Sequence, residues 1–229
     1  MRIAVFGGLA PIPSEFVVQA MEAGHTVTWF IGTDDALPDP ALETDYGEIL
    51  RIERGAWDDD INRYCEIVQG SDAVFVSFTP EHFGPLESWV PQQKMIQHAM
   101  LKEAVKRIVL VTMHGAGDSA RRLDWAAWAR LNANQVFYSL AGRLSPCWSL
   151  AAQYSAQEQV VSDGELDWTV LRPTLVTDGP ATNTYLASAK DVFGGYISAA
   201  DVVDCALKAL VDNMDVKTAF SIAYSSRVA

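Results

Sequence analysis

The sequence predicts an α/β fold in which a doubly wound parallel sheet is covered by helices on both faces. Three observations support this prediction. Short apolar runs alternate with longer segments of helical periodicity, these runs are continuous in their apolar character, and the glycine pair Gly7 and Gly8 directly follows the first of them. Continuous apolar strands separated by helices are typical of a parallel sheet that is buried on both faces.

The expected elements follow one another along the whole chain. Strands are predicted at residues 2–6, 26–31, 49–52, 73–78, 107–113, 168–171 and 220–223. Helices are predicted at residues 15–23, 59–68, 89–104, 125–140, 150–162 and 200–211. Ser14 is the expected N-cap of the first helix, and Gly24 is the expected residue after its C-cap. The proline-rich stretch 36–42 is expected to be a loop after the second strand.

Length and charge limit the classes of function. The 229 residues, 49% of them apolar, are enough for one sizeable core. We expect a single domain over residues 1–229, with a helical region at about 119–165 that covers the substrate. With 17 basic and 29 acidic residues, the net charge of -12 repels nucleic-acid phosphates and anionic lipids. The expected partner is therefore a hydrophobic small molecule, bound by a monomer or a homodimer, and not a nucleic acid or a membrane.

The three cysteines show no C-x-x-C spacing, which favours a reducing compartment and argues against a zinc site. Residues 1–10 lack the pattern of a signal peptide, and no apolar run reaches about 18 residues. We therefore expect a soluble, cytoplasmic protein without a bound metal.

Ligands of open parallel sheets bind beyond the carboxyl ends of the strands, where the strand order reverses. The residues that follow the predicted strands are the candidates for such a site. They are residues 7–14, 32–35, 56–58, 79–82, 114–118 and 174–178.

Two of these regions, 114–118 and 174–178, belong to longer recognisable segments. KRIVLVTMHGAGD (106–118), LDWTVLRPTLVTDGP (166–180) and YISAADVVDCAL (196–207) follow an N-terminal RIAVFGG in this order. Together they resemble the atypical short-chain dehydrogenase/reductase group, and within it the NmrA-like or NAD(P)H-binding family that includes flavin and biliverdin reductases. The resemblance covers nearly the whole chain and implies a Rossmann-like domain.

Members of this family usually carry G-x-x-G-x-x-G after the first strand, and this chain keeps only part of the motif. The three positions are Gly7, Ala10 and Pro13. Ala10 adds a Cβ where the pyrophosphate would lie, and Pro11 and Pro13 have no N–H to donate to phosphate. The Ser14 N–H and the helix dipole remain. We therefore expect standard dinucleotide binding to be lost, and the alternative is binding that involves Gly7, Ala10 and Ser14.

The second and third strands end in further departures from the family pattern. NADP-preferring relatives carry an arginine after the second strand, where this chain has Gly32, Thr33, Asp34 and Asp35. Two carboxylates would repel a 2′-phosphate, whereas Asp34 could bind a ribose hydroxyl. If a dinucleotide binds, NAD is thus favoured over NADP, and the alternative is that both aspartates are ordinary turn residues.

After the third strand, Trp57 stands close to where relatives carry an aspartate near the adenine. It could fill the adenine position as part of the protein, or pack in the core.

The catalytic candidates are His114, Tyr154 and His82. Short-chain dehydrogenases activate a tyrosine with a lysine four residues later, but Tyr154 is followed there by Glu158. His114 lies at the end of the fifth strand, where relatives carry a serine, and a histidine pKa near ~6.5 suits proton transfer. The alternatives are that His114 bonds the local turn and that His82 is an ordinary loop residue.

Aromatic residues gather in the segment 124–154, which suits an apolar pocket, although core packing would explain any one of them. The candidate substrate-binding residues are Thr79, Met113, Asp118, Trp125, Trp128 and Thr174.

These observations favour a redox-neutral enzyme that cyclises, isomerises or dehydrates a hydrophobic metabolite of specialised metabolism. The first alternative is an NAD(P)H-dependent reductase of the NmrA-like family. The second is a nucleotide sensor without catalytic activity.

Overall fold

The computed structural model describes residues 1–33, 35, 38–57, 60–79, 88–122, 147–189 and 195–225. Across these residues runs an eight-stranded sheet of order β3-β2-β1-β4-β5-β6-β10-β8. Its strands are β1 (Arg2–Phe6), β2 (Thr26–Gly32), β3 (Leu50–Gly55), β4 (Ala73–Ser77), β5 (Arg107–Val111), β6 (Asp167–Pro173), β8 (Leu186–Ser188) and β10 (Thr218–Ala223). Neighbouring strands pair in parallel except β8, which is antiparallel to β10. The order reverses between β1 and β4, so the predicted doubly wound parallel sheet is confirmed.

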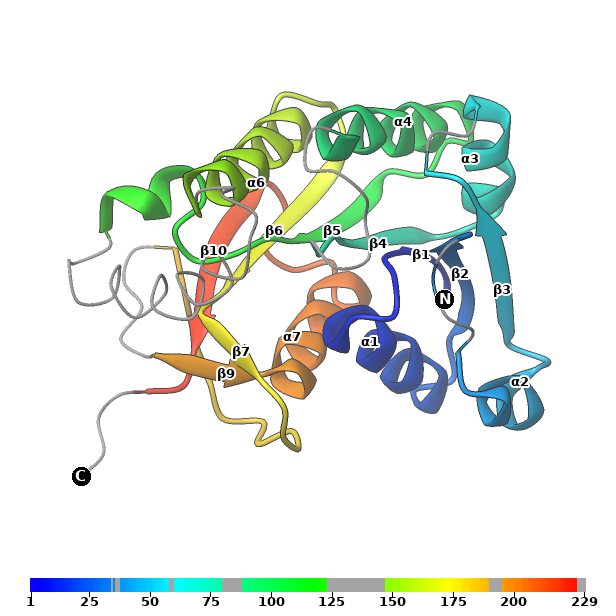
Figure 1. Ribbon diagram of the computed structural model, residues 1–229, viewed down its shortest axis with the longest axis horizontal. Helices are drawn as coiled ribbons and strands as arrows, with labels where there is room; N and C mark the ends of the chain where they lie inside the picture. The colour runs from blue at the N-terminus through cyan, green and yellow to red at the C-terminus, as the bar shows by residue number, and fades with distance from the viewer. Residues whose placement is uncertain are drawn as a thin grey trace, which may run out of the picture.

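Helices cover both faces of this sheet (Figure 1). The helices α1 (Pro11–Glu22) and α7 (Ala199–Val211) pack together on one face. The other face carries α3 (Ile61–Val68), α4 (Trp89–Lys102) and α6 (Cys147–Ser162). Alternate residues of β1 join the two opposite cores, Ile3 and Val5 on one side and Ala4 and Phe6 on the other. Burial on both faces explains why the strands are continuously apolar.

The first helix begins four residues earlier than predicted, and Ser14 is not its N-cap. Ala10 occupies the N-cap position without a side-chain hydrogen bond, and Pro11 follows it. Proline is well suited to the first helical position, since its fixed φ is helical and its missing N–H would have no partner there. At the other end, the prediction for Gly24 is confirmed, because it follows the C-cap Ala23 with a φ of +78°.

Proline also explains a second difference. Residues 36–42 were expected to form a loop, but α2 (Pro40–Tyr46) begins within this stretch. Pro40 is at its start, and the Asp39 carboxylate caps it by accepting the Ala41 N–H at 2.9 Å. The predicted helix at 125–140 lies outside the described residues.

Four short elements were not predicted. The strands β7 (Leu175–Thr177) and β9 (Tyr196–Ser198) form a separate parallel pair, β8 pairs with β10, and the 3-10 helix η2 (Gly117–Arg122) follows β5. The three strands have three residues each, which is too short to show a sequence period. No helix within the described ranges has the length and apolar character needed to cross a membrane.

Candidate functional site

A cavity of about 290 Å³ lies at the carboxyl edge of the sheet, beside the point where the strand order reverses. Its walls come from residues 10–12 at the start of α1, residues 77–79 after β4, residues 111–113 after β5, and residues 173–178 after β6. Leu150 and Tyr154 of α6 complete the lining. The volume of about 290 Å³ is close to the lower end of the range of about 300–1,000 Å³ for small-molecule pockets. The expected location of the site at the strand ends therefore coincides with a real cavity.

A larger, open groove of about 650 Å³ lies elsewhere, between α1, α7 and residues 179–181. Glu15, Glu22 and Asp204 are among its lining residues. This groove is not built from the strand ends, so we regard the smaller cavity as the candidate site.

The polar groups of the cavity are mostly engaged within the protein. The Tyr154 hydroxyl donates to the Phe78 carbonyl oxygen at 2.7 Å. The Thr112 hydroxyl donates to Glu158 Oε1, also at 2.7 Å. Thr79 differs, because its Oγ1 is buried and has no hydrogen-bond partner among the residues that the structure describes. A buried hydroxyl without a partner costs free energy, so Thr79 is the group best placed to bind a polar atom of a ligand.

Aromatic rings form a wall along the cavity on the α4 side. The Phe78 ring, which lines the cavity, lies 6.4 Å from the Trp57 ring and 6.0 Å from the Trp89 ring, measured between centroids. The Trp89 ring in turn lies 5.2 Å from Tyr154. This chain of contacts connects the end of β3 to α6.

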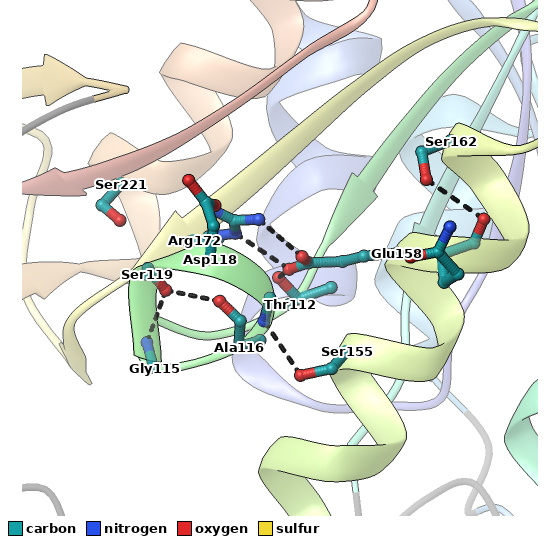
Figure 2. A network of polar contacts seen from close by, with 12 residues as sticks. Thr112, Gly115, Ala116, Asp118, Ser119, Ser155, Glu158, Ser162, Arg172 and Ser221 are labelled. Carbon is teal, nitrogen blue, oxygen red and sulfur yellow. Dashed lines mark hydrogen bonds and ion pairs between the residues drawn. The ribbon is translucent and has the colours of Figure 1, made fainter. Parts of the chain in front are cut away.

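A buried ion pair supports the floor of the site. Arg172 Nε and Nη2 donate to the two carboxylate oxygens of Glu158 at 3.0 and 2.7 Å, and Arg172 Nη1 binds Asp118 (Figure 2). Burial lowers the pKa of Arg172, but the hydrogen bonds and charge of Glu158, followed by those of Asp118, outweigh this and raise the pKa. Arg172 thus ties β6 to α6 and η2.

The start of α1 leaves few donors for an anion. The Ser14 N–H, which was expected to be available, donates to the Ala10 carbonyl oxygen at 3.1 Å because the helix begins earlier than predicted. Pro11 and Pro13 have no N–H. Packing is sufficient to require a glycine at position 7, since a Cβ on Gly7 would lie 2.7 Å from both Pro13 Cγ and the Ser77 carbonyl oxygen.

The loop after β2 is closed by its own hydrogen bonds. Asp35 Oδ2 accepts the Gly32 N–H at 2.8 Å. Arg54 Nη2 donates to the carbonyl oxygens of Thr33 and Asp35, each at 2.7 Å. Residues 32–35 include no arginine, but the folded chain brings Arg54 to this loop. Arg54 belongs to β3, whose register places it beside Ile31 of β2, and sheet pairing brings it to a loop that is distant in sequence.

Trp57 covers the carboxyl end of β2. Its Nε1 lies 2.6 Å from the position that a Cβ on Gly32 would take. The indole meets the Phe30 ring edge-on at 4.8 Å, and the Trp57 carbonyl oxygen accepts the Tyr64 hydroxyl at 2.8 Å. The indole therefore occupies the space between the ends of β2 and β4.

The cavity brings together several of the residues selected from the sequence. Those that line it are Ala10, Thr79, Met113, Tyr154 and Thr174. Their roles stay predictions.

The remaining candidates are placed differently. His114 is not among the lining residues described; it reaches across β6, with Nδ1 2.8 Å from Ser221 Oγ. Asp118 pairs with Arg172. His82, Trp125, Trp128 and Asp34 lie outside the described residues. In the part of the chain that the structure covers, no cluster of three or more histidine, cysteine, aspartate or glutamate side chains could hold a metal ion.

Sequence reasoning missed Phe78 and Arg54. Phe78 directly follows the buried β4, and its position alone could have identified it as a lining residue. Arg54 carried no local signal, since its contacts depend on strand pairing.

Comparison with protein families and with solved structures relates the chain to NAD(P)H-binding proteins. A family model described as NAD(P)H-binding matches residues 7–213. No curated protein sequence matches the chain significantly. These findings support the reductase alternative better than the leading hypothesis of a redox-neutral enzyme.

Solved structures show the same fold. The chain is 16% identical to ChuY, an anaerobillin reductase from Escherichia coli O157:H7, with 100% of both chains covered and a TM-score of 0.75. It is 16% identical to a short-chain dehydrogenase/reductase from Veillonella parvula in complex with NADP, covering 98% of this chain and 95% of that one, with a TM-score of 0.68. The oxidoreductase ylbE from Lactococcus lactis is 13% identical, with 98% and 91% coverage and a TM-score of 0.74. Identities this low establish a likeness in fold.

Proposed function

Because the chain belongs to the NAD(P)H-binding family, we propose that it is a reductase that uses a reduced nicotinamide to reduce a small, largely apolar molecule. The observation that carries this proposal is the cavity of about 290 Å³ beside the reversal of the strand order. Relatives of similar fold are described as an anaerobillin reductase and as an oxidoreductase, and one was solved with NADP, which supports the same chemistry.

The cavity residues fit the nicotinamide end of such a cofactor. Dinucleotides bind across the two halves of a Rossmann sheet, with the adenosine ribose at the end of β2 and the nicotinamide on the other half. The strands that contribute to this cavity are β4, β5 and β6, which belong to that other half. Phe78, Met113 and Pro173 offer apolar contacts to a flat, uncharged ring, and the Thr79 hydroxyl offers a hydrogen bond.

When bound, the reduced nicotinamide supplies a hydride to the substrate. The chain's own residues bind the substrate beside it and exclude bulk water. Leu150 and Val176 contribute apolar surface to the substrate, while Phe78 and Thr79 contact the nicotinamide. The proton that completes the reduction comes from water, since the Tyr154 hydroxyl already donates to the Phe78 carbonyl.

The test is calorimetric titration of the purified chain with NADH and NADPH, followed by turnover assays with flavins, quinones and linear tetrapyrroles. Micromolar binding together with substrate-dependent loss of the reduced nicotinamide absorbance is expected. Absence of binding by either nucleotide at millimolar concentration would contradict the reductase.

One observation favours a second candidate, a redox-neutral reaction on an apolar substrate. Trp57 lies against Gly32 at the end of β2, and Pro11 and Pro13 leave the first turn of α1 with two fewer N–H groups for a pyrophosphate. Conversion of an apolar substrate in the complete absence of nicotinamide would support this candidate over the reductase.

A further inference from the structure

The cavity is confined to one half of the crevice. Its described lining includes residues 77–79 and 111–113 after β4 and β5, but none from β2 or β3. A dinucleotide extends over both halves of the sheet, with its adenosine at the ends of β2 and β3. Among the described residues, this cavity therefore offers space to only one half of such a molecule.

The other half is filled by Trp57. Its indole lies against Gly32 at the end of β2 and reaches the Phe78 ring after β4, so it spans the end of β1 that lies between them. Phe30 supports it edge-on from below, with 4.8 Å between ring centroids. An adenine at the end of β2 would overlap this indole.

The neighbouring groups that would hold the adenosine ribose and the second phosphate are engaged or missing. The Asp35 carboxylate accepts the Gly32 N–H, and Arg54 donates to two carbonyl oxygens of the same loop. Pro11 and Pro13 remove two of the N–H groups that the first turn of α1 would offer to a pyrophosphate.

We infer that this chain recognises its cofactor through the nicotinamide mononucleotide half alone, and that Trp57 takes the place of the adenine. The inference rests on the proposed function, because it specifies which part of a nicotinamide cofactor the same site binds. A dinucleotide then binds with its adenosine outside the protein and gains little affinity from it.

Calorimetry on the full chain tests this inference with three probes: reduced nicotinamide mononucleotide, NADH and NADPH. The wild type is expected to bind all three with affinities within about threefold of one another. Trp57→Ala is expected to bind NADH and NADPH about tenfold more tightly, because the adenine then gains a place to stack on the aromatic wall. The affinity of this variant for the mononucleotide should be unchanged. Trp168→Ala, which removes a partly buried indole from the opposite end of the sheet, is the matched control and should change none of the affinities.

Wild-type affinity for either dinucleotide more than about tenfold above that for the mononucleotide would overturn the inference. Weaker dinucleotide binding by Trp57→Ala would do the same, since Trp57 would then be a stacking partner of the adenine. If Trp57→Ala does not fold, as judged by circular dichroism, the wild-type comparison of the three probes decides. If no probe binds the wild type, the proposed function fails. In that case, dinucleotide binding gained by Trp57→Ala would still support the inference that Trp57 occupies the adenine position. If Trp57→Ala gains no dinucleotide binding either, that inference is overturned as well.

Discussion

Replacing Glu158 by alanine is expected to destabilise the fold by about 3–5 kcal/mol, the usual cost of removing one partner from a buried ion pair. The side chains of Arg172 and Glu158 are only 5% and 7% exposed. The substitution removes both Arg172–Glu158 hydrogen bonds and the acceptor of the Thr112 hydroxyl. Asp118 stays bound to Arg172, but it is 57% exposed, and an ion pair with so exposed a partner contributes about 0–1 kcal/mol.

Urea unfolding followed by circular dichroism measures this effect. Asp118→Ala is the matched control, and it should cost no more than about 1 kcal/mol, since water screens its charge. The double variant Glu158→Leu with Arg172→Met should regain most of the stability, because a buried ion pair replaced by apolar side chains of similar volume is often neutral. A loss below about 1 kcal/mol in Glu158→Ala, or a double variant as unstable as the single one, would refute the reasoning about this ion pair.

Three further predictions concern the site and the loops around it. Thr79→Val removes a buried hydroxyl that has no partner among the described residues, so unfolding curves should show the stability unchanged or raised by up to about 1 kcal/mol. Turnover assays should show kcat/KM about tenfold lower, and an unchanged kcat/KM would contradict a role of Thr79 in binding. Gly7→Ala should lower the free energy of unfolding by about 1–3 kcal/mol, since its Cβ would meet Pro13 and Ser77 at 2.7 Å, and an unchanged urea midpoint would contradict this packing. Burial raises the pKa of Asp201, but the hydrogen bonds from Tyr224, Thr182 and Asn183 outweigh burial and lower this pKa. The Asp201 carboxylate therefore stabilises the fold at neutral pH, and this stabilisation is lost as the pH falls through the lowered pKa. Urea midpoints at neutral pH and about pH 3 should therefore fall more steeply for the wild type than for Asp201→Asn, and equal slopes would exclude Asp201 as a source of acid sensitivity.

The strands were predictable because their signal is local. Residues 3–6 and 73–76 are continuously apolar, as expected of strands buried on both faces. The rule that ligands bind at the carboxyl ends of parallel strands then selected Thr79 and Thr174, which do line the cavity. Helix starts were less accurate, since Pro11 and Pro40 begin helices that composition alone assigned to loops.

The sequence by itself thus determined the order of the elements, the doubly wound sheet and the edge at which the site lies, because each depends on patterns within a few residues. Only the tertiary structure decided how the site is closed. Trp57 lies over Gly32, Arg54 reaches the loop after β2, and Glu158 pairs with Arg172, all between elements that are separate in the chain. Such contacts depend on strand register and helix packing, which no local pattern encodes.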